Sequence, residues 1–188
     1  MFGRTTMTLH PGMTRLNENA VPNVKNTSFT VACRLDLPAE PADGVLVAQG
    51  GGFGGWTLYL DAGTPVYVHN FVGLESFTVR GDRALGPGEQ VLVLRFDYDG
   101  GGAGRGGDVR FLLDGAEVGK GRVERTVPAL FSFDEGLDVG LDSLDPVVPD
   151  YPTAQGRSTG TIRDVVIDVA PDPEHDPDLV VRARYRKQ

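Results

Sequence analysis

The chain of 188 residues has only one cysteine, Cys33, and no long apolar run. A single cysteine cannot form an intrachain disulfide, so nothing in the sequence requires an oxidising compartment. A membrane helix needs about 18 successive apolar residues, and the first residues also lack the shorter apolar stretch of a secretion signal. We therefore expect a cytoplasmic protein.

Positive charge is scarce as well. The 18 Lys and Arg residues face 26 Asp and Glu residues, which gives a net charge of -8. An acidic surface repels the phosphates of nucleic acids and the headgroups of anionic lipids. We expect neither nucleic acid nor a membrane among the partners.

Helical periodicity is missing too, because no apolar pattern of period 3.6 persists for about ten residues. The 26 glycines and 13 prolines instead separate short segments, and the clearest of these has apolar side chains at every second position over residues 29–37. Such alternation is typical of a strand with one buried face. Further strands are expected at 45–48, 56–60, 65–71, 75–80, 91–98, 109–113, 118–127, 137–141 and 161–169.

Many short strands joined by turns predict an all-β fold, a two-sheet antiparallel sandwich of the jelly-roll type. A bulge near Arg163 would bring Ile162 onto the apolar face of the last strand. We expect one domain over residues 1–170. Residues 171–188 would be a tail, either a short helix or disordered.

Catalytic motifs are absent or misplaced. Residues 102–107 fit the pattern G-x-G-x-x-G, but a strand follows where a dinucleotide site needs a helix, so a hairpin loop is expected. The histidines have no zinc-site spacing, no G-x-S-x-G elbow is present, and no strand carries the paired carboxylates of a glycosidase. Cys33 falls on an apolar strand face, which predicts a buried, inert thiol. We expect no catalytic site.

Aromatic and polar residues gather between positions 56 and 71. Trp56 shares a strand face with Leu58 and Leu60, which places it in the core. Sugar rings stack on aromatic faces while polar side chains bind their hydroxyl groups. A ligand-binding set is therefore predicted, consisting of Tyr59, Tyr67, His69 and Asn70, and the first three of these are expected on an exposed face.

Acidic residues cluster late in the chain, on segments expected to be loops. Carboxylate oxygens on adjoining loops are suitable ligands for calcium, although solvated loop carboxylates are the simpler interpretation in an acidic chain. The candidate calcium ligands are Asp134, Glu135, Asp138, Asp142 and Asp145.

Several segments together resemble one known family. They are PGMTRLNENAVPNVKN at 11–26, GVLVAQGG at 44–51 with FGGW at 53–56, YDGGG at 98–102, FDE at 133–135 with DVG at 138–140, and GTI at 160–162. These residues resemble the C-terminal domain of large bacterial, especially actinobacterial, arylsulfatases over about positions 3–169. The resemblance implies a concanavalin A-like, laminin G-like sandwich that accompanies a catalytic domain.

Sulfatases make their catalytic formylglycine from a Cys-x-Pro-x-Arg motif. Here Leu35 and Leu37 occupy the Pro and Arg positions after Cys33, so the resemblance transfers no catalytic residue. Two hypotheses follow. The first is a non-catalytic accessory domain that packs on a sulfatase catalytic domain, associates with itself or contacts carbohydrate. The second is a stand-alone lectin-like, carbohydrate-binding module, with or without calcium.

Overall fold

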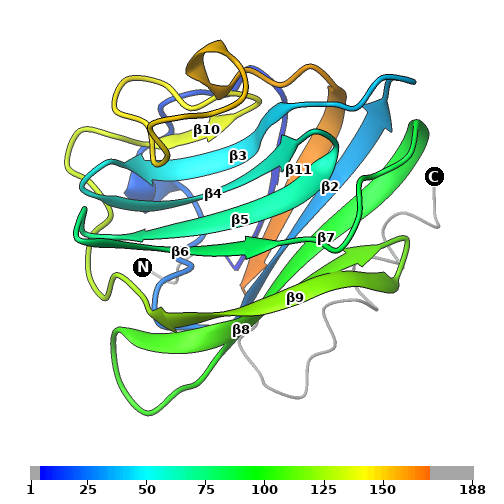
Figure 1. Ribbon diagram of the computed structural model, residues 1–188. Helices are drawn as coiled ribbons and strands as arrows, with labels where there is room; N and C mark the ends of the chain where they lie inside the picture. Colours follow the sequence, from blue (N-terminus) through cyan, green and yellow to red (C-terminus); the bar gives the residue numbers. More distant parts are fainter. Residues whose placement is uncertain (1–4, 170–188) are drawn as a thin grey trace.

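The computed structural model describes residues 5–169, which form two antiparallel sheets packed face to face (Figure 1). Sheet A has the strand order β1-β11-β2-β7-β8-β9, and sheet B has the order β10-β3-β4-β5-β6. The predicted all-β jelly-roll class is confirmed. The strands are β1 (Thr6–Leu9), β2 (Phe29–Leu37), β3 (Gly44–Gly51), β4 (Gly54–Asp61), β5 (Thr64–Phe71), β6 (Glu75–Arg80), β7 (Gly88–Tyr98), β8 (Arg105–Leu113), β9 (Ala116–Arg125), β10 (Leu137–Val139) and β11 (Thr161–Val169). Two short 3-10 helices, Glu18–Ala20 and Ala154–Gly156, lie in the connections.

The core lies between the sheets, where the apolar positions of the alternating strands meet. Phe29 of β2 stacks on Phe96 of β7 with ring centroids 5.2 Å apart, and it also contacts Trp56 of β4. Trp56 is fully buried, as expected, and its indole Nε1–H donates to Gln49 Oε1 at 3.0 Å. That bond satisfies the one polar atom of the Trp56 ring, so its burial carries no unpaired donor.

Cys33 lies in the same core with no exposed surface. Burial, with a smaller effect of the Asp164 carboxylate, raises the pKa of its thiol. The thiol therefore stays protonated, as the sequence predicts.

The first strand, β1, was not predicted, and β8 begins earlier than expected. β1 has no clear alternation, and it exists because it pairs with the edge of β11. β8 begins at Arg105, so Gly106 and Gly107 belong to a strand that the sequence assigned to a loop. A Cβ on Gly107 would lie 2.6 Å from the Phe96 ring. Only glycine at this position allows the ring to pack against the backbone of β8. The predicted bulge is present, as a register shift between Ile162 and Asp164.

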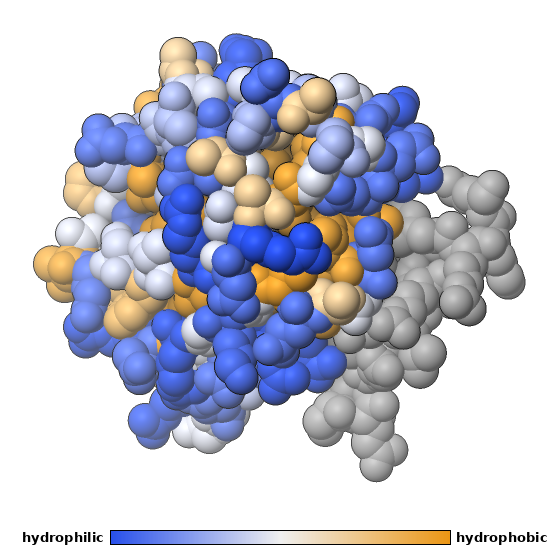
Figure 2. All heavy atoms as spheres, turned by 45° about the vertical axis from the view of Figure 1, so that its right-hand side comes forward, coloured by the Kyte–Doolittle hydropathy of each residue, from blue (hydrophilic) through white to orange (hydrophobic). Residues whose placement is uncertain are grey.

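The space-filling view in Figure 2 shows a mostly hydrophilic surface with a hollow whose floor is hydrophobic. Among residues 5–169, no helix has the length and apolar character needed to cross a bilayer. The predicted tail at 171–188 lies outside the described residues.

Candidate functional site

Tyr67 and His69 do not lie on an exposed face, and that prediction was wrong. In the register of β4 and β5, Tyr67 is opposite Leu58 and His69 is opposite Trp56, so both side chains point into the core. They are 1% and 3% exposed. β5 is apolar on both faces, so period-two alternation could not tell its inner face from its outer one.

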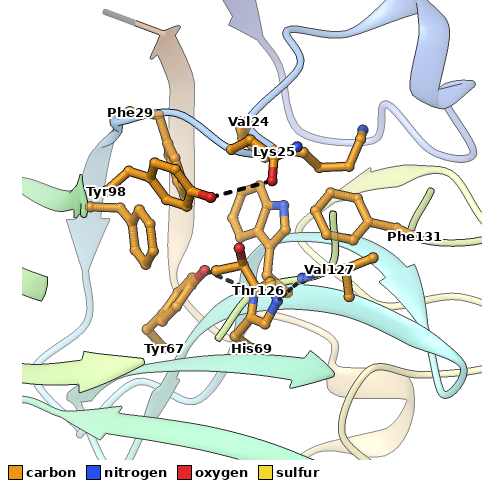
Figure 3. A pocket seen from close by; sticks show the side chains of 12 residues that line it. Val24, Lys25, Phe29, Tyr67, His69, Tyr98, Thr126, Val127 and Phe131 are labelled. Atoms are coloured by element: carbon orange, nitrogen blue, oxygen red, sulfur yellow. Dashed lines mark hydrogen bonds between the residues drawn. The ribbon is translucent and has the colours of Figure 1, made fainter. Parts of the chain in front are cut away.

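Figure 3 shows how these two side chains are bound inside a cleft between the sheets. The His69 Nε2 atom accepts a hydrogen bond from the backbone N–H of Val127 at 3.1 Å, and its Nδ1 atom lies 3.5 Å from the Tyr67 hydroxyl. Burial lowers the pKa of His69 to about 4. His69 is therefore neutral at pH 7, and it holds the start of the segment that follows β9.

The cleft is small and largely aromatic. It has room for only about 10 Å³, far below the ~300–1,000 Å³ typical of ligand pockets. Lys25, on its lining, forms an ion pair with Glu18 and lies 4.9 Å from the centre of the Phe131 ring. The side chains that line the cleft therefore contact one another, and they leave no room for a sugar ring.

The other two predicted ligand residues lie elsewhere. Tyr59 is half-buried on the outer face of sheet B, where its ring meets the edge of Tyr151 at 5.2 Å. The Asn70 amide is buried and donates to the carbonyls of Gly51 and Gly52 at 3.2 and 3.0 Å, while it accepts from the Gly73 N–H. Asn70 thus fastens two turns together. The structure does not bring the four residues to one surface, and ligand binding by them stays a prediction.

The acidic residues brace loops. Asp138 accepts hydrogen bonds from the Arg15 N–H and from both the N–H and the hydroxyl of Ser143. Asp142 accepts from the Val147 N–H and the Tyr151 hydroxyl.

Asp145 and Glu135 also hold loops in place through hydrogen bonds. Asp145 accepts from the Gly52 N–H, and Glu135 accepts from the Asp145 N–H. Asp134, the fifth candidate, is exposed. Within residues 5–169, no three His, Cys, Asp or Glu side chains are arranged to hold a metal ion. The calcium site stays a prediction that these contacts do not support.

The outer face of sheet A carries a different arrangement, which the sequence analysis missed. Arg95 of β7 is directly opposite Arg110 of β8, and Arg110 is directly opposite Lys120 of β9. We call these three residues the cation row. Like charges on directly opposed positions repel one another, so the row sets three mutually repelling cations side by side across three strands. A negatively charged ligand would relieve that repulsion.

Carboxylates lie in the next row. Asp97 is opposite Asp108, and Asp108 is opposite Arg122, which also binds Asp99. Arg95 Nε donates to Asp97 at 2.8 Å, and Arg110 lies 4.0 Å from the same carboxylate. Lys120 is exposed, and its ammonium has no partner among residues 5–169. The end of the cation row at β9 is therefore the part most available to a ligand.

Arg110 and Lys120 line an open hollow of about 450 Å³, within the ~300–1,000 Å³ range of ligand sites. Asp108 and Glu117 also line it and supply acceptors beside the cations. Because these side chains stand on paired strands, the backbone fixes their spacing. The polar positions of the strands could be read from the sequence, but their alignment into rows depends on register, which the sequence alone did not give.

Comparisons with known proteins match the fold but give no family. No protein-family model matches the chain, and no curated protein does. Among solved structures, a CBM40 domain of the Ruminococcus gnavus IT-sialidase bound to α2,3-sialyllactose is similar, with a TM-score of 0.57 and 13% identity. The match covers 95% of this chain and 96% of that one.

Two further structures are matched over part of their longer chains. The receptor-binding domain of botulinum neurotoxin D has a TM-score of 0.57 and 11% identity, over 96% of this chain and 44% of that one. The mouse laminin α1 domains LG4-5 have a TM-score of 0.47 and 15% identity, over 89% of this chain and 39% of that one. This chain spans less than half of either. At such identities the likeness to the CBM40 domain and the neurotoxin domain establishes the fold alone, a jelly-roll sandwich.

Proposed function

We propose that this domain is a non-catalytic, lectin-like module that binds glycans carrying an acidic group. The cation row holds the carboxylate or sulfate of the sugar, and the neighbouring carboxylates accept hydrogen bonds from its hydroxyl groups. The observation that carries the proposal is the pair Arg110 and Lys120, two cations directly opposed on adjacent strands at the wall of an open hollow. The CBM40 domain bound to sialyllactose, an acidic trisaccharide, supports the proposal through its fold.

The chemistry of the hollow suits an acidic sugar better than a neutral one. Arginine and lysine donate charge-assisted hydrogen bonds to carboxylates, and such bonds are roughly twice as strong as neutral ones. Arg110 is the donor with a planar fork, and its side chain is 46% exposed, so a ligand can reach it without unfolding the sheet. Lys120 adds a mobile charge beside it.

Calorimetric titration of the full chain with sialyllactose and with lactose tests this proposal. We expect sialyllactose to bind and lactose to bind at least about tenfold more weakly, since a lost charge-assisted bond costs about 1.5–3 kcal/mol. Arg110→Ala and Lys120→Ala should each weaken sialyllactose binding about tenfold, whereas Arg83→Ala, an equal loss of charge on the exposed β6–β7 loop, should not. Equal binding of the two sugars, or none of either, would contradict the proposal.

The accessory-domain hypothesis rests on the sequence resemblance to arylsulfatase C-terminal domains, and the comparisons add nothing to it. It predicts that the purified chain does not hydrolyse an aryl sulfate. It also predicts that a sulfatase catalytic domain binds the chain with measurable affinity. Hydrolysis by the chain alone would exclude the accessory role.

A further inference from the structure

The large hydrophobic side chains that stay exposed among residues 5–169 all lie on loops. Two of them, Phe53 and Phe133, are 81% and 92% exposed, and Leu74 is 82% exposed. Side chains this exposed contribute almost nothing to folding. We call the set the apolar crown, and it consists of Phe53, Val72, Leu74, Leu130, Phe133 and Leu144.

Contacts between loops bring the crown to one end of the sandwich. Figure 1 shows the β3–β4 turn, the β5–β6 turn and the segment after β9 at the same end, on the left of that view. In the β5–β6 turn, a Cβ on Gly73 would lie 3.0 Å from the Gly52 carbonyl oxygen, and the Gly73 backbone has a φ of +71° that favours glycine. The loop that carries Leu144 joins the same group, because Asp145 accepts a hydrogen bond from the Gly52 N–H at 3.1 Å.

Four residues of the crown line an apolar groove of about 450 Å³. Phe53 and Val72 line one side of it, and the residues from 127 to 134 line the other, with Leu130 and Phe133 among them. A contiguous exposed apolar surface of this kind marks a site of contact with another protein or with a membrane. The loops are held firmly by Asn70, Asp138 and Asp145, so the side chains are presented on a fixed base.

We propose that the apolar crown inserts into the interface of a zwitterionic phospholipid membrane. Its side chains stand on four separate loops, and the most exposed of them contact little of the protein, so a rigid partner would need a matching pocket for each. The fluid acyl boundary of a bilayer accepts such side chains without a fixed shape. Burial of each phenylalanine in that boundary supplies the binding free energy.

The negative charge around the crown determines which lipid headgroups it can approach. Carboxylates of Glu75, Asp134, Glu135 and Asp145 lie on the crown loops or beside them, and Arg125 is the cation that pairs with Glu75. An acidic border is repelled by anionic headgroups but is compatible with phosphatidylcholine, whose outer group is a cation. The same border disfavours a second copy of this chain, because two crowns would bring their carboxylates together. The repulsion from anionic lipid expected from the net charge thus sets the lipid class.

Sedimentation with vesicles tests the proposal. Wild-type protein should bind pure phosphatidylcholine vesicles, and vesicles with a third of their lipid replaced by phosphatidylserine should bind it less. Phe53→Ser and Phe133→Ser should each weaken binding about tenfold, the factor that burial of one such side chain supplies. Arg83→Ser, on an exposed loop that carries no crown residue, should bind as the wild type does.

The variant Phe133→Trp keeps a large apolar ring and reports insertion directly. Its added fluorescence, measured against the buried Trp56 background, should shift to the blue with phosphatidylcholine vesicles, and its binding should equal that of the wild type. Absence of vesicle binding by folded wild-type protein would overturn the proposal and point to a protein as the occupant of the crown. Stronger binding with phosphatidylserine, or unchanged binding of both serine variants, would also overturn it.

Discussion

The outer face of sheet A and the apolar crown use the same chain in opposite ways. On the sheet face, charged residues such as Arg110 and Lys120 are exposed, and the strands fix their spacing. In the crown, the exposed side chains are apolar, and buried carboxylates such as Asp138 hold the loops beneath them. In both regions the exposed side chains are available to a ligand or partner, and buried groups hold the backbone beneath them in place. Three pairs of variants test how buried and exposed residues contribute to the stability of this fold.

The largest effect is expected within one loop of the crown. Phe131 is 4% exposed and contacts His69 in the cleft, so Phe131→Ala should lower the free energy of unfolding by about 3–5 kcal/mol. Phe133, two residues later, is 92% exposed. Phe133→Ser should therefore change the free energy of unfolding by less than about 0.5 kcal/mol. Urea unfolding monitored by circular dichroism measures both. Equal losses would mean that Phe133 supports the fold and is not available for binding.

The next effect is a pair of opposed pH dependences. Burial raises the pKa of Asp142 to about 6, so the folded state keeps a proton that the unfolded chain releases near its usual pKa of 3.8, and stability falls as pH rises from about 4 to 6. The pKa of His69 is lowered to about 4 from 6.5, so stability falls as pH decreases from about 6.5 to 4. Each shift of about two units corresponds to about 3 kcal/mol. In the wild type these two contributions largely cancel.

Single variants should expose the two slopes. In Asp142→Asn, the free energy of unfolding should fall by about 3 kcal/mol on acidification from pH 6.5 to 4, because only the His69 contribution remains. In His69→Gln, it should rise by a similar amount over the same range. Urea titrations at half-unit pH intervals measure both slopes. If both variants kept the wild-type profile, neither group would be buried as described.

The smallest effect compares one substitution in the two regions. Asp138→Ala removes the acceptor of three hydrogen bonds at a site 5% exposed, and it should cost about 2–3 kcal/mol. Asp108→Ala on the sheet face breaks an ion pair with Arg122 whose side chains are 57% and 40% exposed, and it should cost at most about 1 kcal/mol. Thermal unfolding of both variants at one pH makes the comparison. A larger loss for Asp108 would reverse the assignment of supporting residues.

The sequence predicted the strands where one face is apolar and the other polar. Residues 29–37 alternate cleanly, and β2 occupies those positions. The prediction failed for Tyr67 and His69 because β5 has apolar residues on both faces, and only the register with β4 shows that both side chains point into the core. Phe53 and Phe133 lie in turns without periodicity, so only the contacts between distant loops reveal the crown.

The central claim is that the cation row binds an acidic glycan, and an NMR titration with sialyllactose tests it most directly. We predict saturable shifts of the backbone amides near Arg95, Arg110 and Lys120 on adjacent strands, and no shifts at Phe53 or Phe133. Lactose should leave the amides of the cation row unchanged. Shifts confined to the crown or to the cleft around His69, or no shifts at a saturating concentration of the sugar, would contradict the claim.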